Sequence, residues 1–163
     1  MRDALLGNVP QDWDICTSAL PQQVINTFSD YRVIKTGIKH GTVTLMLNSN
    51  MYEITTFRTE KDYSDNRRPD TVEFVADIKE DLSRRDFTVN AMAYNPKQGL
   101  IDLFFGLDDL DMRIIRTVGN ADVRFNEDAL RILRALRFSA KLCFNIEKST
   151  AASVHRNKGL LNN

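Results

Sequence analysis

The sequence TVTLMLNSNMYEITTF, residues 42–57, reads as two strands joined by a tight turn. Val43, Leu45 and Leu47 fall on one face of the first strand, because side chains alternate along an extended chain. Residues 48–50, Asn-Ser-Asn, supply the turn, and residues 51–57 return as the paired strand. Short helices are predicted before this hairpin. The pattern therefore favours an α+β fold, a small mixed or antiparallel sheet with flanking helices.

An acidic segment, DWDICT at residues 12–17, is predicted to form another strand of this sheet. Asp12 and Asp14 then point to one face and Trp13 to the other. Two carboxylates aimed at one place suit Mg²⁺, which proteins hold with one or two carboxylates plus substrate phosphates. Glu53 on the returning strand is the candidate for a third carboxylate. The pattern favours metal-dependent phosphoryl or nucleotidyl transfer; the alternative is an exposed Asp-X-Asp without function.

The composition predicts one ordinary soluble domain with a hydrophobic core. The chain has 163 residues, 42% of them hydrophobic, and its 22 basic residues balance its 22 acidic ones. Any RNA contact must therefore come from local patches. Cys16 and Cys143 are too few and too far apart for a disulfide framework, which favours reduced thiols in a cytoplasmic protein without a signal peptide. No apolar run is long enough for a membrane span.

Helices are predicted at both ends of the chain and a loop in the middle. Residues 2–6 form a helix that Gly7 ends, and a short helix begins near Pro21. Residues 58–70 are expected to be a mobile polar loop without internal periodicity. From about residue 72 the pattern is helical, apart from residues 100–103. We expect one helix from Asn126, as its N-cap, through Phe138, and a last helix from about residue 148.

The segment RRDFTVNA, residues 84–91, is rich in groups that bind phosphate and sugar. A guanidinium group can hold phosphate or ribose oxygens, and Asp86 or Asn90 can hydrogen-bond ribose hydroxyls. The alternative is a salt bridge at a helix end between Asp86 and a neighbouring arginine.

The segment EDALRILRALRF, residues 127–138, repeats a charged residue every third position. On a helix this spacing gives a slowly drifting stripe, with apolar residues opposite it as the expected buried face (Ala129, Ile132, Leu133 and Leu136). Cytosine and adenine both present an amine donor beside a ring-nitrogen acceptor. Asp128 could accept from the amine while Arg131 donates to the ring nitrogen. The alternative is a solvated face with an Asp128–Arg131 pair one turn apart.

Several segments together resemble the head and neck of bacterial class II tRNA nucleotidyltransferases, the CCA-adding enzymes of the poly(A) polymerase family. The similarity covers nearly the whole chain in the right order. Its segments are RDALLG (2–7), DWDI (12–15), KTGIKHGTV (35–43), YEITTFR (52–58), DYSDNRRPDTVEFVADIKEDLSRRDFTVNAMAYNP (62–96) and RTVGNADVRFNEDALRILRALRF (116–138). The resemblance implies a polymerase-beta-like nucleotidyltransferase head over residues 1–115 and an all-helical neck over residues 116–163.

The resemblance also implies roles for individual residues. Asp12 and Asp14 resemble the catalytic pair that binds Mg²⁺, with Glu53 as a third catalytic carboxylate. Residues that resemble nucleotide ligands are Arg2 (the triphosphate-contacting arginine of a GGxVRD loop), Arg85, Asp86 and Asn90 (in the ribose-contacting motif), Asp128 and Arg131 (a protein template for CTP and then ATP), and Arg134 and Arg137. Residues 62–70 resemble the flexible loop needed to add the terminal A. The implied partners are CTP, ATP and the tRNA 3′ end, with no membrane.

The chain also departs from the family pattern. It begins at Met1 where the family has the glycine pair, Phe105 stands where a small residue is frequent, and the helical body and tail that hold tRNA are expected to be missing after about residue 155. One alternative is therefore a fragment that binds nucleotide and Mg²⁺ without tRNA. A poly(A) polymerase is disfavoured because GIKHGTVTLML, residues 37–47, lacks the expected basic strand. A CC-adding enzyme is disfavoured because residues 62–70 are present.

Overall fold

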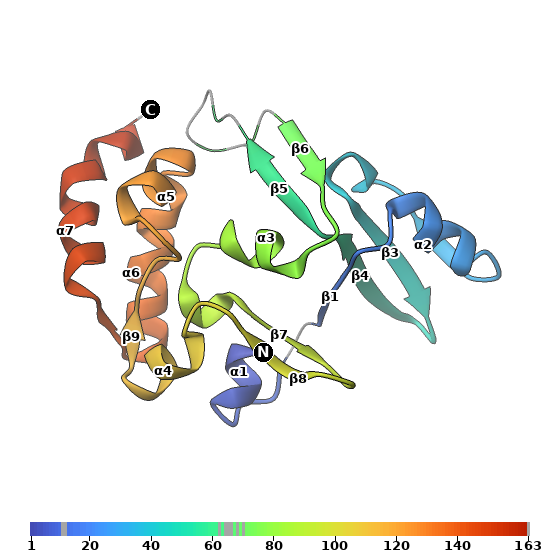
Figure 1. The fold of residues 1–163 in the computed structure, drawn as a ribbon, viewed down its shortest axis with the longest axis horizontal. Coiled ribbons are helices and arrows are strands. Elements are labelled where there is room, and N and C mark those ends of the chain that lie inside the picture. The colour runs from blue at the N-terminus through green and yellow to red at the C-terminus, as the bar shows by residue number, and fades with distance from the viewer. Residues whose placement is uncertain (11–12, 62, 64–66, 68, 70, 163) are drawn as a thin grey trace. The chain divides into compact units, whose positions relative to one another are not determined.

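The computed structural model describes residues 1–10, 13–61, 63, 67, 69 and 71–162. The chain divides into two compact units. Unit 1 comprises Met1–Val9, Lys61–Thr71 and Leu82–Asn163, and unit 2 comprises Pro10–Glu60 and Val72–Asp81. Each unit has its own hydrophobic core, and together they confirm an α+β fold with small sheets and flanking helices (Figure 1).

Unit 2 is built on a four-stranded sheet of order β1-β4-β3-β2. Its strands are β1 (Asp14–Thr17), β2 (Arg32–Ile34), β3 (Thr42–Leu47) and β4 (Asn50–Thr56). β1 runs parallel to β4, whereas β3 is antiparallel to both β2 and β4. The helix α2 (Pro21–Thr27), with Pro21 in its first turn, packs against β3, and the short 3₁₀ helix η1 covers Ile38–His40. The sheet is therefore mixed, as predicted, and β2 is a strand that the sequence analysis did not predict.

The predicted hairpin is confirmed at β3 and β4, because Leu47 pairs with Asn50 across a two-residue turn. Asn48 and Ser49 both have positive φ, 49° and 65°. Such left-handed pairs match the twist of the strands they join. Val43, Leu45 and Ile54 are buried with Val24 of α2 in the core of the unit. The opposite face of the sheet carries Asp14, Thr44 and Glu53.

Residues 58–74 contain strands that were not predicted. β5 (Arg58–Lys61) pairs with β6 (Thr71–Phe74), so residues 58–61, expected as loop, belong to a two-stranded sheet. Residues 62, 64–66, 68 and 70 of the expected loop lie outside the described residues. The expectation of helix from residue 72 is wrong here as well. β5 (Arg-Thr-Glu-Lys) has no apolar residue, and the alternation of Val72 and Phe74 in β6 is too short to identify a strand from local sequence.

Unit 1 contains most of the helices (Figure 1). These are α1 (Arg2–Leu5), α4 (Gly106–Asp111), α5 (Ala121–Glu127), α6 (Leu130–Leu142) and α7 (Lys148–Asn157), while α3 (Ile78–Ser83) begins in unit 2 and ends in unit 1. Two 3₁₀ helices, η2 (Thr88–Asn90) and η3 (Lys158–Asn162), complete the helical part. The predicted helices at residues 2–6 and from residue 148 are confirmed.

Short strands interrupt the region that was expected to be helical. β7 (Met92–Asn95) pairs with β8 (Gly99–Asp102), and β9 (Ile114–Ile115) pairs in parallel with β10 (Asn145–Ile146). Residues 116–163 are thus not entirely helical, because β10 lies between α6 and α7. The core of the unit includes Phe87, Val89, Ile115 and Ala135, all 0% exposed.

The helix expected from Asn126 through Phe138 is two helices. Asp128 adopts an extended conformation (φ −141°, ψ 104°) and ends α5, and α6 begins at Leu130. Asn126 therefore lies inside α5. The capping asparagine is Asn120, whose side chain accepts hydrogen bonds from the backbone N–H groups of Asp122 and Val123.

The buried face of α6 also differs from the prediction. Ala129 and Ile132 are buried as expected, but Leu133 and Leu136 are 48% and 49% exposed, and Arg131 is buried at 7%. An arginine can be buried when its N–H groups have acceptors. Within the part of the chain that is described, no helix is long and apolar enough to cross a membrane.

Candidate functional site

Unit 2 places two carboxylates side by side on one face of its sheet. Asp14 on β1 is the direct register partner of Glu53 on β4, and directly paired residues project to the same face. Thr44 of β3 is the partner of Glu53 on its other side. Asp14 and Glu53 are both exposed. Asp12, the other member of the predicted Mg²⁺-binding pair, lies outside the described residues.

This donor set fits a hard cation. Carboxylate oxygens are the ligands that Mg²⁺ prefers, and an exposed face leaves room for the water and phosphate oxygens that complete its coordination. Among the residues that the structure describes, no three His, Cys, Asp or Glu side chains gather at metal-binding distance. The described part of the predicted metal site therefore consists of the Asp14–Glu53 pair.

Unit 1 brings four of the predicted nucleotide ligands into one network. Arg2 Nη1 donates to Asn90 Oδ1 at 2.7 Å, and Asn90 Nδ2 donates to Asp86 Oδ1 at 3.0 Å. The other oxygen of this carboxylate, Asp86 Oδ2, accepts from Arg134 Nε at 2.7 Å and from its Nη2 at 2.5 Å. A fifth predicted ligand, Arg85, donates from Nη1 to the Asn90 carbonyl at 3.2 Å. Residues more than 80 positions apart thus meet in one polar cluster.

Asp86 is the centre of this cluster and is 7% exposed. It also accepts a hydrogen bond from the Phe87 backbone N–H at 2.8 Å. The sequence offered a salt bridge between Asp86 and a neighbouring arginine as the alternative to a ligand role. The observed ion pair is instead with Arg134, which lies 48 residues away on α6. The pair fixes the start of the 86–90 segment against α6.

The predicted template residues, Asp128 and Arg131, lie on either side of the α5–α6 break. Asp128 Oδ1 accepts from the Leu130 backbone N–H at 2.9 Å and so caps the start of α6. Arg131 Nη1 donates to Glu127 Oε2 at 2.6 Å, and its Nη2 donates to the Arg84 carbonyl at 3.1 Å. The Asp128–Arg131 pair offered as the alternative is not observed among these contacts.

Glu127 is a residue of the site that the sequence analysis did not single out. Its second oxygen pairs with Arg124 Nη2 at 2.7 Å, so Glu127 bridges Arg124 and Arg131. The i,i+3 and i,i+4 spacing of these three residues could have indicated the bridge. Arg137, the remaining predicted ligand, is exposed on α6.

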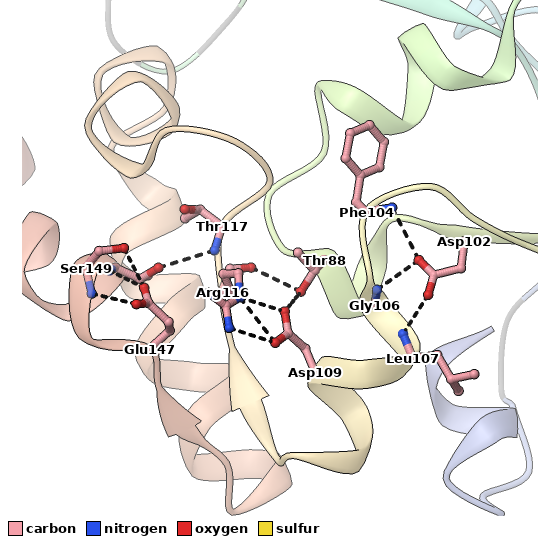
Figure 2. A network of polar contacts seen from close by, with 11 residues as sticks. Thr88, Asp102, Phe104, Gly106, Leu107, Asp109, Arg116, Thr117, Glu147 and Ser149 are labelled. Atoms are coloured by element: carbon pink, nitrogen blue, oxygen red, sulfur yellow. Dashed lines mark hydrogen bonds and ion pairs between the residues drawn. The ribbon is translucent and has the colours of Figure 1, made fainter.

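A second polar cluster supports the segment that carries Asn90 (Figure 2). Asp109 of α4 is 2% exposed, accepts from Thr88 Oγ1 at 2.7 Å and pairs with Arg116 Nε at 3.0 Å. The Asp109 carboxylate raises the pKa of Arg116, chiefly through this hydrogen bond. The Thr88 backbone N–H in turn donates to the Arg116 carbonyl at 3.0 Å. η2 is therefore held from two sides.

Asp3 is the acidic neighbour of Arg2 at the cluster. The hydrogen bond from Arg2 Nε, 2.8 Å long, lowers the pKa of the Asp3 carboxyl below its usual value. Arg2 thus donates hydrogen bonds within the protein from Nε, to Asp3, and from Nη1, to Asn90.

Comparison with known families gives a match over most of the chain. The model of the poly(A) polymerase head domain matches residues 1–116. That range holds the Asp14–Glu53 pair and the 84–91 segment, and it stops before α5 and α6.

Relatives of the whole chain are CCA-adding enzymes. The enzyme of Lactobacillus delbrueckii subsp. bulgaricus is 52% identical over 161 residues, which cover 99% of this chain and 40% of the relative. The enzyme of Streptococcus mutans is 51% identical, with 99% of this chain and 40% of the relative covered. The chain spans about two fifths of the length of these curated relatives.

Solved structures agree with this match. The crystal structure of the Bacillus stearothermophilus CCA-adding enzyme in complex with CTP is 45% identical and has a TM-score of 0.87, covering 98% of this chain and 38% of that one. The Thermotoga maritima CCA-adding enzyme complexed with tRNA is 32% identical with a TM-score of 0.76, covering 99% of this chain and 37% of that one. The fold and the family model agree, and the chain belongs to the poly(A) polymerase head-domain family.

Proposed function

We propose that this chain is the head and neck of a tRNA nucleotidyltransferase that adds CCA to tRNA 3′ ends from CTP and ATP. The main support is a network of hydrogen bonds and ion pairs that joins Arg2, Asp86, Asn90 and Arg134. The chain that holds this network matches a CTP-bound CCA-adding enzyme over 98% of its length. We further propose residues 1–115 as the nucleotidyltransferase head and residues 116–163 as the neck. The compartment that fits this role is the cytoplasm.

Unit 2 is proposed to supply the metal-binding carboxylates. Asp14 and Glu53 share one face of the sheet, and Asp12 would join them if the strand continues with the same alternation. When bound, Mg²⁺ would supply charge neutralisation at the phosphates and a more acidic attacking hydroxyl. The protein's own contribution is to hold these carboxylates in register and exposed to substrate.

Unit 1 is proposed to hold the nucleotide. Arg2 and Arg134 are the cations for the triphosphate, with Arg85 and Arg137 as further ligands. Asp86 and Asn90 order the ribose side of the site. Because Asp86 already binds Arg134, we propose that it acts mainly by setting the direction of that guanidinium.

Asp128 and Arg131 are proposed to read the base. Glu127 and the Arg84 carbonyl fix the guanidinium of Arg131, and its Nε has no acceptor among the described residues. That N–H remains to donate to the ring nitrogen of cytosine or adenine, while Asp128 accepts from the exocyclic amine. Guanine and uracil present the reverse order and would leave polar groups unpaired, which is costly.

The test is incorporation of labelled CTP and ATP, with Mg²⁺, into tRNA that lacks its 3′ CCA, with GTP and UTP as controls. Incorporation of C and then A alone supports the proposal. Addition of A alone would indicate a poly(A) polymerase, and addition of C alone a CC-adding enzyme. Absence of CTP and ATP binding would overturn the nucleotide site altogether.

The metal role is tested separately in unit 2. Trp13 is the single tryptophan of the chain, is 57% exposed and adjoins Asp14, so its fluorescence can report Mg²⁺ binding. We expect Asp14→Asn and Glu53→Gln to weaken the Mg²⁺ response and to lower incorporation by about 100-fold or more, since a bound metal contributes several kcal/mol. Asp30→Asn, an exposed carboxylate in the same unit, is the matched control. Wild-type Mg²⁺ affinity in Glu53→Gln would exclude Glu53.

A second candidate is a head that binds nucleotide and Mg²⁺ but does not hold tRNA. The equal numbers of basic and acidic residues favour it, because RNA affinity depends on an excess of positive charge. Binding of CTP and ATP without incorporation into tRNA would support this candidate.

A further inference from the structure

Phe138 lies at the centre of two cation–π contacts in unit 1. The guanidinium carbon of Arg2 is 4.7 Å from the centre of its ring, and that of Arg134 is 5.3 Å away. Both distances are within the range in which an aromatic face attracts a cation. Arg134 is one helical turn before Phe138 on α6, whereas Arg2 comes from α1. The ring is therefore shared by cations from two separate elements.

The ring itself is held in place. Phe138 packs edge-on against Phe87, with ring centres 5.8 Å apart and planes at 81°. Phe87 is 0% exposed and belongs to the core of unit 1. An edge-to-face pair of this kind fixes ring orientation more firmly than contact with an aliphatic side chain. The position of the two cations thus depends on an anchored ring.

Phe138 completes a closed set of contacts. Arg2 binds Asn90, Asn90 binds Asp86, Asp86 binds Arg134, and both arginines contact the ring of Phe138. Within the described part of the chain, Arg2 Nη2 and Arg134 Nη1 have no acceptor. Each cation therefore keeps N–H donors for a ligand, while its direction is set by the protein.

We infer that Phe138 is a positioning residue for a polyphosphate: its ring holds the guanidinium groups of Arg2 and Arg134 so that their remaining N–H groups serve one triphosphate. This inference rests on the proposed function and extends it, because an uncharged side chain would set the arrangement of the two cations. Two like charges repel each other, and the negative face of the shared ring, together with the carboxylates of Asp3 at Arg2 and Asp86 at Arg134, offsets that repulsion. The base would be read by other residues, so the ring should affect phosphate affinity and not base choice.

The test compares three variants of the whole chain. Phe138→Leu removes the ring but keeps apolar contact with the core, and Phe138→Tyr keeps the ring. Leu142→Ala, one turn later on α6, removes a side chain that packs on the same core and is the control for packing alone. Affinity is measured for CTP, for cytidine and for inorganic tripolyphosphate, and the thermal midpoint is recorded for each variant.

We expect Phe138→Leu to weaken CTP and tripolyphosphate binding about tenfold, because two cation–π contacts are lost. Cytidine binding should change little, and Phe138→Tyr should restore the affinity for CTP. Leu142→Ala should lower the thermal midpoint without a selective loss of tripolyphosphate. Unchanged tripolyphosphate affinity in Phe138→Leu, or an equal loss for cytidine, would overturn the inference.

A second readout separates this inference from the proposed function. Arginine side-chain NMR resonances of Arg2 and Arg134 should be shifted by the ring current of Phe138 and should move in Phe138→Leu. If the wild-type chain binds no CTP, ATP or tripolyphosphate, the proposed function and this inference both fail. If it binds them but the arginine resonances are the same in Phe138→Leu, the inference fails while the proposed function stands.

Discussion

Phe105 is a residue in a backbone conformation that suits glycine. Its φ is 60° and its ψ is 34°, and its side chain is 73% exposed, so packing does not offset the strain of the left-handed region. The next residue, Gly106, is needed for space. A Cβ added there would lie 2.4 Å from the Thr88 carbonyl oxygen. Phe105, the residue before α4, and Gly106, its first residue, therefore have opposite requirements.

We expect Phe105→Gly to raise the free energy of unfolding by about 0.5–1 kcal/mol, the left-handed penalty less the entropy cost of glycine. Phe105→Ala keeps the strained backbone without the ring and should change it less. Gly106→Ala should lower it by about 1–3 kcal/mol, as overpacking does. Chemical denaturation measures all three. Equal values for Phe105→Gly and Phe105→Ala would show that the backbone is not strained.

Asp128 serves two purposes in the proposed site, because it caps α6 and is the proposed acceptor for the base amine. Asp128→Asn keeps a capping oxygen but adds an N–H donor. We expect its stability to stay near that of the wild type and its preference for CTP and ATP over GTP and UTP to fall about tenfold or more. Competition binding of the four nucleotides measures this preference. Unchanged selectivity would exclude Asp128 from base reading.

At the scale of elements, α7 begins with an acidic cap that its sequence did not indicate. Glu147 accepts from the backbone N–H groups of Ser149 and Thr150 at 2.9 and 2.8 Å, and from Ser149 Oγ at 2.6 Å. Burial by itself raises the pKa of Glu147, but the hydrogen bonds from Ser149 and Thr150 outweigh it and lower the pKa to about 2. The charged carboxylate is thus the form that holds the start of α7.

This cap predicts a loss of stability in acid. The folded pKa of about 2 is below the ordinary value of 4.5, so the contribution of Glu147 is present above pH 4.5 and is lost as pH falls towards 2. We expect Glu147→Gln to reduce the slope of thermal midpoint against pH between these values. Ser149→Ala removes one of the donors and should have an intermediate slope. A Glu147→Gln slope equal to that of the wild type would contradict the cap's role.

A second carboxylate joins α5 to α7. Asp122 accepts from Arg156, Ser153 and Asn157, and the hydrogen bond from Arg156 is the largest cause that lowers its pKa to about 2. Stability from this contact is also lost as pH falls from about 4 to 2, so Asp122 and Glu147 titrate in the same window. Asp122→Asn combined with Glu147→Gln should therefore flatten the acid slope further than either alone.

At the scale of the whole molecule, charge balance limits what the chain can bind. With 22 basic and 22 acidic residues, it has no excess of positive charge to attract RNA from a distance. The cations of unit 1 that matter for the proposed site are mostly paired, as Arg131 with Glu127 and Arg134 with Asp86. They are arranged for a small anion instead of a long phosphate backbone.

We therefore expect weak binding of this chain to tRNA, with a Kd of about 1 μM or weaker at physiological salt, as for nonspecific contacts. The affinity should depend only modestly on salt, since few phosphates are neutralised. Titration of labelled tRNA lacking its CCA end, at several KCl concentrations, measures both quantities. Binding at nanomolar Kd would show that a local patch offsets the balanced charge.

The sequence by itself determined the elements whose signals are local. Alternation from residue 42 to 57 predicted the hairpin, and Pro21 marked the start of α2. The apolar spacing correctly identified Ile132 on the buried face of α6 but wrongly placed Leu133 and Leu136 there. Family motifs predicted the carboxylate and nucleotide-binding residues, and the structure tests none of their roles. What it shows is that Asp14 and Glu53 are register partners and that Arg2, Asp86, Asn90 and Arg134 make contact.

Only the tertiary structure decided which side chains meet and where elements stop. β5 pairs with β6 although β5 has no apolar residue. The extended backbone at Asp128 separates α5 from α6, where the sequence periodicity predicted a single helix. Arg131 is buried while Leu133 is exposed, because Glu127 and the Arg84 carbonyl accept its N–H groups. Local sequence sets backbone preference and periodicity, but burial, ion pairing and ring contacts depend on residues that are distant along the chain. The ring of Phe138 shows this most plainly, because its two cations are separated by more than 130 positions in the sequence.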